Sequence, residues 1–193
     1  MQSKYTRYLA LAPLAFCGAA IAHPGHAGHL PGALAGLMHP FLGLDHLLAM
    51  LAVGVWATQL GGRAQWLLPL SFVALLAAGG GMAMAGVGLP MVEGGIATSV
   101  LLLGILIALA VKMPTALAAA MVGVFALFHG HAHGSEMPAF STPWQYAFGF
   151  MLASALLHGA GVWLGKGLQR QAVWLRGGGA LIALGGLWMG AAI

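Results

Sequence analysis

Long apolar runs separated by short polar breaks cover most of the chain, and they predict membrane-spanning helices. A helix needs about 20 apolar residues to cross the hydrocarbon core of a bilayer. The runs are continuously apolar and do not alternate at a period of two residues, which excludes the pattern of a transmembrane β-barrel. Six predicted spans follow, at about 37–59, 66–86, 93–111, 114–133, 144–165 and 173–192.

The segment before the first span has the three parts of a secretory signal peptide. Two basic residues precede a short apolar run, and Ala20-Ile21-Ala22 forms a small-residue cleavage pattern. Cleavage there leaves a mature N-terminus at His23, outside the cytoplasmic membrane, and an uncleaved anchor is the alternative. We therefore predict a signal peptide over residues 1–22 and a single six-helix transmembrane domain over residues 23–193.

Composition supports this class. Of the 193 residues, 61% are hydrophobic and only 5% are charged, and the mean hydropathy is +0.93. A soluble domain carries about 25% charged residues, so this chain has too few charges to cover a surface that faces water. Soluble enzymes and nucleic-acid-binding proteins are thereby excluded, and the net charge of +4 indicates no nucleic-acid partner. The predicted class is an all-α integral membrane protein, with the lipid bilayer as its surroundings.

The basic residues indicate the orientation of the spans. If the mature N-terminus is outside, the three cytoplasmic loops and their flanks contain every Lys and Arg that follows the signal peptide. This distribution obeys the positive-inside rule. It predicts that both mature termini lie outside the bacterial cytoplasmic (inner) membrane. The basic residues concerned are Arg63, Lys112, Lys166, Arg170 and Arg176.

A first group of ionisable residues lies in the first span, where such residues are costly and usually functional. His39 and His46 are seven positions apart, so on one helix they share a face about 10 Å apart along the axis. Pro40 biases His39 away from helical backbone, which would place it at the outer mouth. Imidazole with the carboxylate of Asp45, and no thiolate, suits nickel, cobalt or zinc. The alternative is a buried Asp–His pair that ties helices together.

A second group of ionisable residues lies at the outer end of the fourth span. His129, His133 and Glu136 stand at i, i+4 and i+7 and form one helical stripe. His131 lies between them and points the opposite way. His-rich tracts are typical of metal binding, and the alternative is an incidental solvated loop at the outer end of the span.

Glu93 opens the third span from the outer side. A glutamate at a helix N-terminus also compensates the helix dipole, so its position alone does not decide its role. The argument for a function is that Asp45, Glu93 and Glu136, all the acids of the chain, fall at the outer ends of their spans. All the basic residues of the mature chain fall inside, so cations would be drawn in from one side.

The remaining histidines are accessory candidates. His158 lies past the midplane of the fifth span and is either a deeper relay ligand or a core histidine bonded to a backbone carbonyl. His131 belongs to the same accessory group. The mature N-terminal tail either captures metal outside or is an irregular end, and its histidines are His23, His26 and His29.

The two motifs together resemble the HupE/UreJ family of nickel and cobalt permeases. They read His39-Pro40-x-x-Gly43-x-Asp45-His46-Leu47-Leu48-Ala49-Met50 and Phe128-His129-Gly130-x-Ala132-His133-Gly134-x-Glu136. The resemblance covers the whole chain, and neither motif is interrupted. It implies secondary uptake of Ni²⁺, sometimes Co²⁺, that supplies hydrogenase or urease maturation. It also implies functional roles for His39, Asp45, His46, His133 and Glu136, and strengthens the case for Glu93.

No ATP-binding signature accompanies these motifs in the sequence. We therefore expect no ATPase subunit and no prosthetic group, with Ni²⁺ or Co²⁺ as the transported substrate. Two other classes stay open, as does assembly into a homo-oligomer. The first is an intramembrane metal-dependent hydrolase, although the chain has neither H-E-x-x-H nor G-x-S-x-G. The second is a metal-sensing membrane subunit that does not transport.

Metal binding by imidazole predicts a pH dependence. Only neutral imidazole offers a lone pair to the ion, and the ordinary pKa of the group is about 6.5. Uptake of labelled Ni²⁺ should therefore fall as the external pH drops through about 6.5. Initial rates measured in cells at a fixed membrane potential test this, and a rate that stays level or rises toward acid pH would contradict it.

Overall fold

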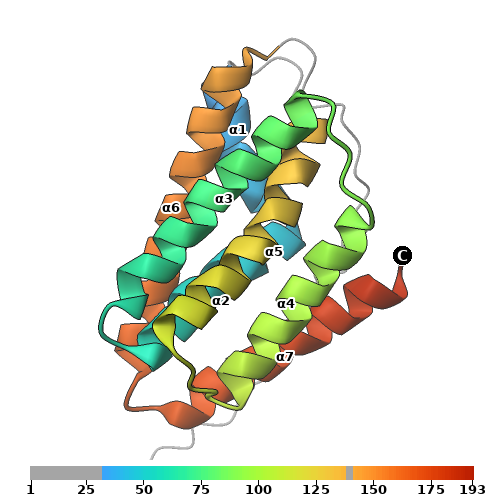
Figure 1. Cartoon of the computed structure of the whole chain (residues 1–193). Coiled ribbons are helices and arrows are strands. Elements are labelled where there is room, and N and C mark those ends of the chain that lie inside the picture. The colour runs from blue at the N-terminus through green and yellow to red at the C-terminus, as the bar shows by residue number, and fades with distance from the viewer. Residues whose placement is uncertain (1–31, 138–140) are drawn as a thin grey trace, which may run out of the picture.

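The computed structural model describes residues 32–137 and 141–193, and this part of the chain folds into seven helices (Figure 1). The predicted signal peptide and the tail histidines His23, His26 and His29 lie outside the described residues. The helices are α1 (Gly32–Leu42), α2 (Leu44–Leu60), α3 (Ala64–Met84), α4 (Val92–Ala108), α5 (Thr115–Ser135), α6 (Pro143–Leu168) and α7 (Ala172–Ala191).

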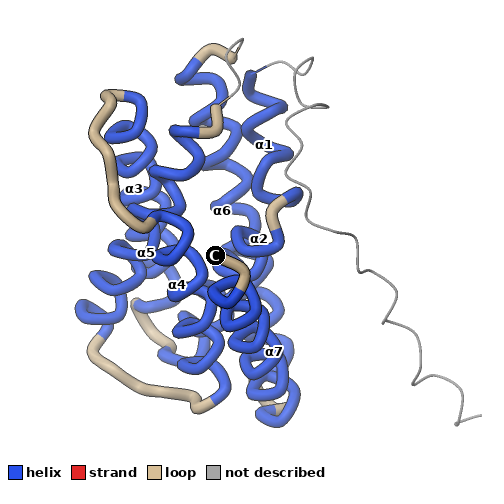
Figure 2. Tube along the Cα trace, turned by 90° about the vertical axis from the view of Figure 1, so that its right-hand side faces the viewer, coloured by secondary structure: helices blue, strands red, loops and turns tan. Residues whose placement is uncertain are grey.

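The helices pack as a bundle around α2. The closest pairs are α3 with α5, α4 with α7, and α6 with both α1 and α2, and Figure 2 shows the bundle from the side. Every residue from Ala52 to Thr58 is buried. A helix that is apolar and buried all round forms the centre of a structure rather than its surface. The outer helices in turn expose large apolar side chains such as Trp163, Trp174 and Leu181.

Length and composition make this a helical membrane protein. In the described part of the chain, α3, α5, α6 and α7 are each long and apolar enough to cross a bilayer, and α1 and α2 pass the same test as a bent pair. Helix α4 is apolar but only 17 residues long. The predicted all-α membrane class is thus confirmed, while the count of six spans stays a prediction.

The first predicted span is not one helix. The prediction of a single helix over residues 37–59, with His39 and His46 on one face, is wrong, because α1 and α2 meet at an 81° bend. The break falls at Gly43, whose backbone is extended. A Cβ at this position would lie 2.7 Å from the Asp45 carboxylate and 3.0 Å from the His46 ring. The expected departure of His39 from helical backbone is also wrong, since α1 continues through Pro40.

Glycines let α3 and α5 pack backbone to backbone. A Cβ added at Gly79 would collide with the carbonyl of Leu127, and one added at Gly130 with the carbonyl of Leu76. Small residues of this kind are how membrane helices approach closely. Because Gly130 lies between His129 and the end of α5, this contact also sets the depth of the second histidine group.

Basic side chains bind helix ends at the side of the bundle away from the acids. Lys112 Nζ donates to the carbonyl of Gln59 near the end of α2, and Arg176 Nε donates to the last carbonyl of α4, that of Ala108, at 2.8 Å. Cations stabilise helix C-termini, where backbone carbonyls lack partners. The acids lie at the other side of the bundle. Glu93 is in the first turn of α4, at the end opposite Ala108, and Glu136 directly follows the last residue of α5.

A substitution at the α3–α5 contact tests this packing. Gly130→Ala should destabilise the protein by about 1–3 kcal/mol, because the added methyl group has to push the two backbones apart. Thermal unfolding of purified protein in detergent measures the effect. Gly159→Ala in α6 is the matched control, since a Cβ there meets nothing within 4 Å. Equal melting temperatures for the two variants would contradict the proposed role of Gly130.

Candidate metal centre

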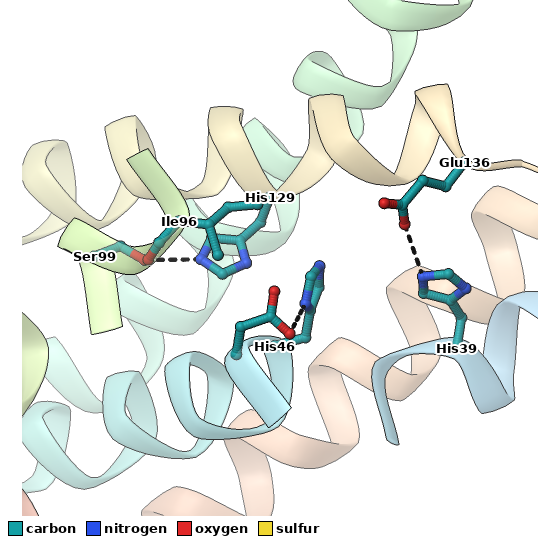
Figure 3. Close-up of polar contacts among 7 residues, drawn as sticks. His39, His46, Ile96, Ser99, His129 and Glu136 are labelled. Carbon is teal, nitrogen blue, oxygen red and sulfur yellow. Dashed lines mark hydrogen bonds and ion pairs between the residues drawn. The ribbon is translucent and has the colours of Figure 1, made fainter. Parts of the chain in front are cut away.

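Four imidazole rings from three helices form one row inside the bundle. The ring centroids of His39 and His133 lie 4.6 Å apart, and those of His133 and His46 lie 4.0 Å apart. The row continues from His46 to His129, with 5.0 Å between centroids. We call these four residues the histidine row, and Figure 3 shows three of them between Glu136 and Ser99. Helix α1 contributes His39, α2 contributes His46, and α5 contributes His129 and His133.

The row begins at a surface carboxylate. Glu136 Oε2 lies 3.4 Å from His39 Nε2, and the two side chains are 54% and 29% exposed. His133, next in the row, is only 2% exposed. One ligand atom from each of these three residues lies within 4.8 Å of the others. Nitrogen and oxygen ligands bind at about 2.0–2.2 Å from such a metal, so small side-chain rotations would bring all three onto one ion.

Asp45 lies against His46. Its Oδ1 is 2.6 Å from His46 Nδ1, the separation of an ion pair. Neither ring nitrogen of His46 has a hydrogen-bond partner among the described residues, and both are buried. Carboxylates commonly orient metal-binding histidines in this way. Asp45 is thus placed to position His46, whatever further contact it makes with an ion.

Ser99 sets the protonation of His129 at the deep end of the row. The Ser99 hydroxyl donates its one proton to the carbonyl of Ile96 at 2.7 Å, so toward His129 it can only accept. His129 Nε2, 2.8 Å from Ser99 Oγ, must therefore be the donor (Figure 3). In the neutral ring the lone pair is then on Nδ1, which is buried without a hydrogen-bond partner in the described part of the chain.

His133 is a member of the row that forms no side-chain hydrogen bond among the described residues. Within the described ranges, both of its ring nitrogens are buried without hydrogen-bond partners, and so is the hydroxyl of Tyr146. Both side chains border a cavity of about 130 Å³, which Phe150 also lines. An unpaired buried polar group costs about 1–3 kcal/mol. Nitrogens left in this state are available to an incoming ligand.

The other sequence candidates form no hydrogen bond or ion pair with the row in the part of the chain that the structure describes. Glu93 is exposed in the first turn of α4 and belongs to no ion pair among the described residues. His131 points away, and its Nε2 lies 2.9 Å from the carbonyl of Val87. His158 lies in α6, where its Nδ1 donates to the carbonyl of Ser154. Its ring packs against Phe72, which also packs against His129 of the row.

Sequence reasoning missed Ser99 and Tyr146. Neither position carries a signal, because a single hydroxyl in an apolar run usually bonds to its own helix. Their relevance comes from contacts across helices, between α4 and α5 for Ser99 and between α6 and α1 for Tyr146, whose ring centroid is 6.0 Å from that of His39.

Neutral imidazoles with nearby carboxylates and no thiolate make a site for a divalent metal of borderline softness. A buried row of this kind, reached from a surface carboxylate in a helical bundle, defines a metal-handling membrane protein. The chain belongs to the HupE/UreJ family: residues 10–189 match the family described as HupE / UreJ protein.

A curated relative supports the same assignment. Protein HupE of Rhizobium leguminosarum bv. viciae is 50% identical over 179 residues, which cover 91% of this chain and 92% of the relative. No solved structure matches the chain. The family consists of metal transport and accessory proteins and not of enzymes, so the hydrolase alternative is set aside.

Removing the Ser99 hydroxyl tests the protonation of His129. Ser99→Ala should weaken Ni²⁺ binding by about 10–100-fold, the usual cost of losing a group that orients a metal ligand. Equilibrium binding of labelled Ni²⁺ to purified protein measures the loss. Ser71→Ala is the matched control, because Ser71 also donates to a backbone carbonyl, that of Ala119, but outside the row. Unchanged binding in Ser99→Ala would contradict the assignment.

Proposed function

We propose that this protein takes up divalent nickel, with cobalt as a second cargo, across the bacterial cytoplasmic membrane by secondary transport. The metal would supply hydrogenase or urease maturation, as the family resemblance implies. The observation that carries the proposal is the histidine row, which leads inward from a surface carboxylate and whose buried imidazole nitrogens include several without partners among the described residues. A protein that only needed stability would not leave several such nitrogens unpaired.

The proposed orientation of the chain would put the entry of the row outside the cell. In the proposed topology a signal peptide is removed at His23, six spans follow, and both mature termini lie outside. The bent pair of α1 and α2 counts as the first span and α4 as the third. The basic loops then face the cytoplasm. Glu136 and Glu93, at the outer ends of α5 and α4, attract cations to the mouth.

Capture begins where the row meets water. Hydrated Ni²⁺ approaches Glu136 and His39, whose exposure leaves them accessible from outside. Exchange of bound water for His39 and His133 nitrogens moves the ion from the surface into the bundle. A cavity of about 130 Å³ borders His133 and leaves space beside its ring.

Transfer along the row uses ligand exchange between neighbouring rings. Successive ring centroids are 4.0–5.0 Å apart, so one ion contacts the next imidazole before it leaves the previous one. Each ring is a neutral ligand of moderate strength, which permits release, whereas a closed four-ligand cage would hold the ion. Asp45, beside His46, compensates the charge of the ion in the middle of the row.

The membrane potential supplies the driving force. A divalent cation that moves inward gains about 4.6 kcal/mol per 100 mV, twice the value for a single charge. Entry therefore needs neither ATP nor a coupled proton, provided that proteins in the cytoplasm bind the arriving metal and keep its free concentration low.

Two substitutions at the centre of the row test the transport function. Asp45→Ala and His46→Ala should each reduce saturable Ni²⁺ uptake at least about tenfold, because each removes a charged or ligating group in the middle of the path. The measurement is labelled Ni²⁺ uptake by nickel-transport-deficient cells, with Co²⁺ and Zn²⁺ as competitors and the amount of protein in the membrane as the reference.

Leu44→Ala is the matched control, since this neighbouring side chain at the start of α2 is 54% exposed and apolar. It should transport like the wild type. Normal uptake by Asp45→Ala or His46→Ala would overturn the site. Metal binding by the purified wild-type protein without uptake by cells or liposomes would instead indicate a metal-sensing subunit.

A further inference from the structure

His158 is a buried histidine outside the histidine row. One of its ring nitrogens forms a hydrogen bond, and the other has no partner among the described residues. It lies in α6 and is 1% exposed. Its Nδ1 donates to the carbonyl of Ser154, one turn earlier. Because a carbonyl can only accept, the proton is on Nδ1, and the neutral ring carries its lone pair on Nε2. Nε2 is buried and has no hydrogen-bond partner among residues 32–137 and 141–193.

The bond to Ser154 alone does not account for an imidazole at this position. A core histidine of ordinary structural purpose satisfies both nitrogens, because an unpaired buried acceptor costs about 1–3 kcal/mol. In the described structure, Nε2 of His158 incurs this cost without a compensating contact. The lone pair of His158 Nε2, which the bond to Ser154 holds in a fixed direction, therefore needs an explanation.

His129 and His158 share both an environment and a mode of positioning. The Phe72 ring packs against each of them, with centroid separations of 5.7 Å to His129 and 4.8 Å to His158. Each histidine donates one N–H to an acceptor on its own or a neighbouring helix, and its other nitrogen has no partner among the described residues. His158 thus lies against the same phenylalanine ring as the deepest member of the row, with one ring nitrogen left unpaired in the same way.

We propose that His158 Nε2 is a separate, deeper binding station for the divalent cation, which receives the ion after His129. This inference rests on the proposed function, because it extends the same path toward the cytoplasm. The ion bound there keeps water in its remaining coordination positions, so the station is weaker than the row. A weak last ligand favours release on the side where the free metal concentration is low.

The test separates the ligand nitrogen from the hydrogen bond. In His158→Asn the side-chain amide nitrogen takes the place of Nδ1 and still donates to Ser154, while Nε2 is lost. His158→Ala loses both. If His158 is a station, both variants should lower the maximal rate of labelled Ni²⁺ uptake at least tenfold. The half-saturating Ni²⁺ concentration should stay unchanged, because capture at the mouth is intact.

Metal content gives a second readout that does not depend on transport. Purified His158→Asn should bind fewer equivalents of Ni²⁺ than the wild type under saturating metal, while the affinity of the remaining sites stays the same. Leu156→Ala, a lipid-facing change in the same helix at a side chain that is 57% exposed, is the control and should match the wild type in both assays. If His158→Asn does not accumulate in the membrane, His158→Ala takes its place in this assay, since it also lacks Nε2.

The outcomes distinguish this inference from the function on which it rests. Wild-type uptake by His158→Asn overturns the station, whether or not His158→Ala is impaired, because the hydrogen bond would then suffice. If the wild type itself fails to take up nickel, the proposed function is overturned. The station is in that case decided by metal content, and equal stoichiometry in the wild type and His158→Asn rejects it.

Discussion

Because the chain turns through 81° at Gly43, His39 and His46 approach the histidines of α5 from two different helices. The ring centroids of His39 and His46 are 6.3 Å apart, and they lie 4.6 Å and 4.0 Å from the centroid of the His133 ring. The turn depends on a residue without a side chain, since a Cβ at Gly43 would meet the Asp45 carboxylate and the His46 ring. The row, its carboxylate and its entry all follow from this bend.

The second constraint is the cost of unpaired polar groups inside a bilayer. The fold satisfies most of its intramembrane polar side chains locally: Thr58, Ser99 and Ser154 each donate to a carbonyl of their own helix. The imidazoles differ, because each row member deep in the bundle keeps at least one nitrogen without a hydrogen-bond partner among the described residues. That residual cost is compensated only when a ligand arrives, which links the stability of the site to the metal that it binds.

Much of the fold could be predicted from hydrophobicity alone. The predicted spans at 66–86, 114–133, 144–165 and 173–192 each begin and end within three residues of α3, α5, α6 and α7, because apolar runs and turn residues act locally. The prediction for the first span was wrong because Gly43 was treated as part of a continuous helix. Pro40 is accommodated inside α1, and the helix ends at Gly43 instead. Ser99 and Tyr146 were missed because their partners come from other helices.

The sequence by itself determined the class of protein, the distribution of charge and the residues of the two motifs, because hydrophobicity and residue chemistry are properties of single positions and their near neighbours. Only the tertiary structure decided the order of the row, the pairing of Asp45 with His46, and which nitrogen of His129 and His158 is left free. Those features depend on which helices touch and at what depth. That depth is set by glycine contacts between backbones far apart in the chain, such as Gly130 against Leu76.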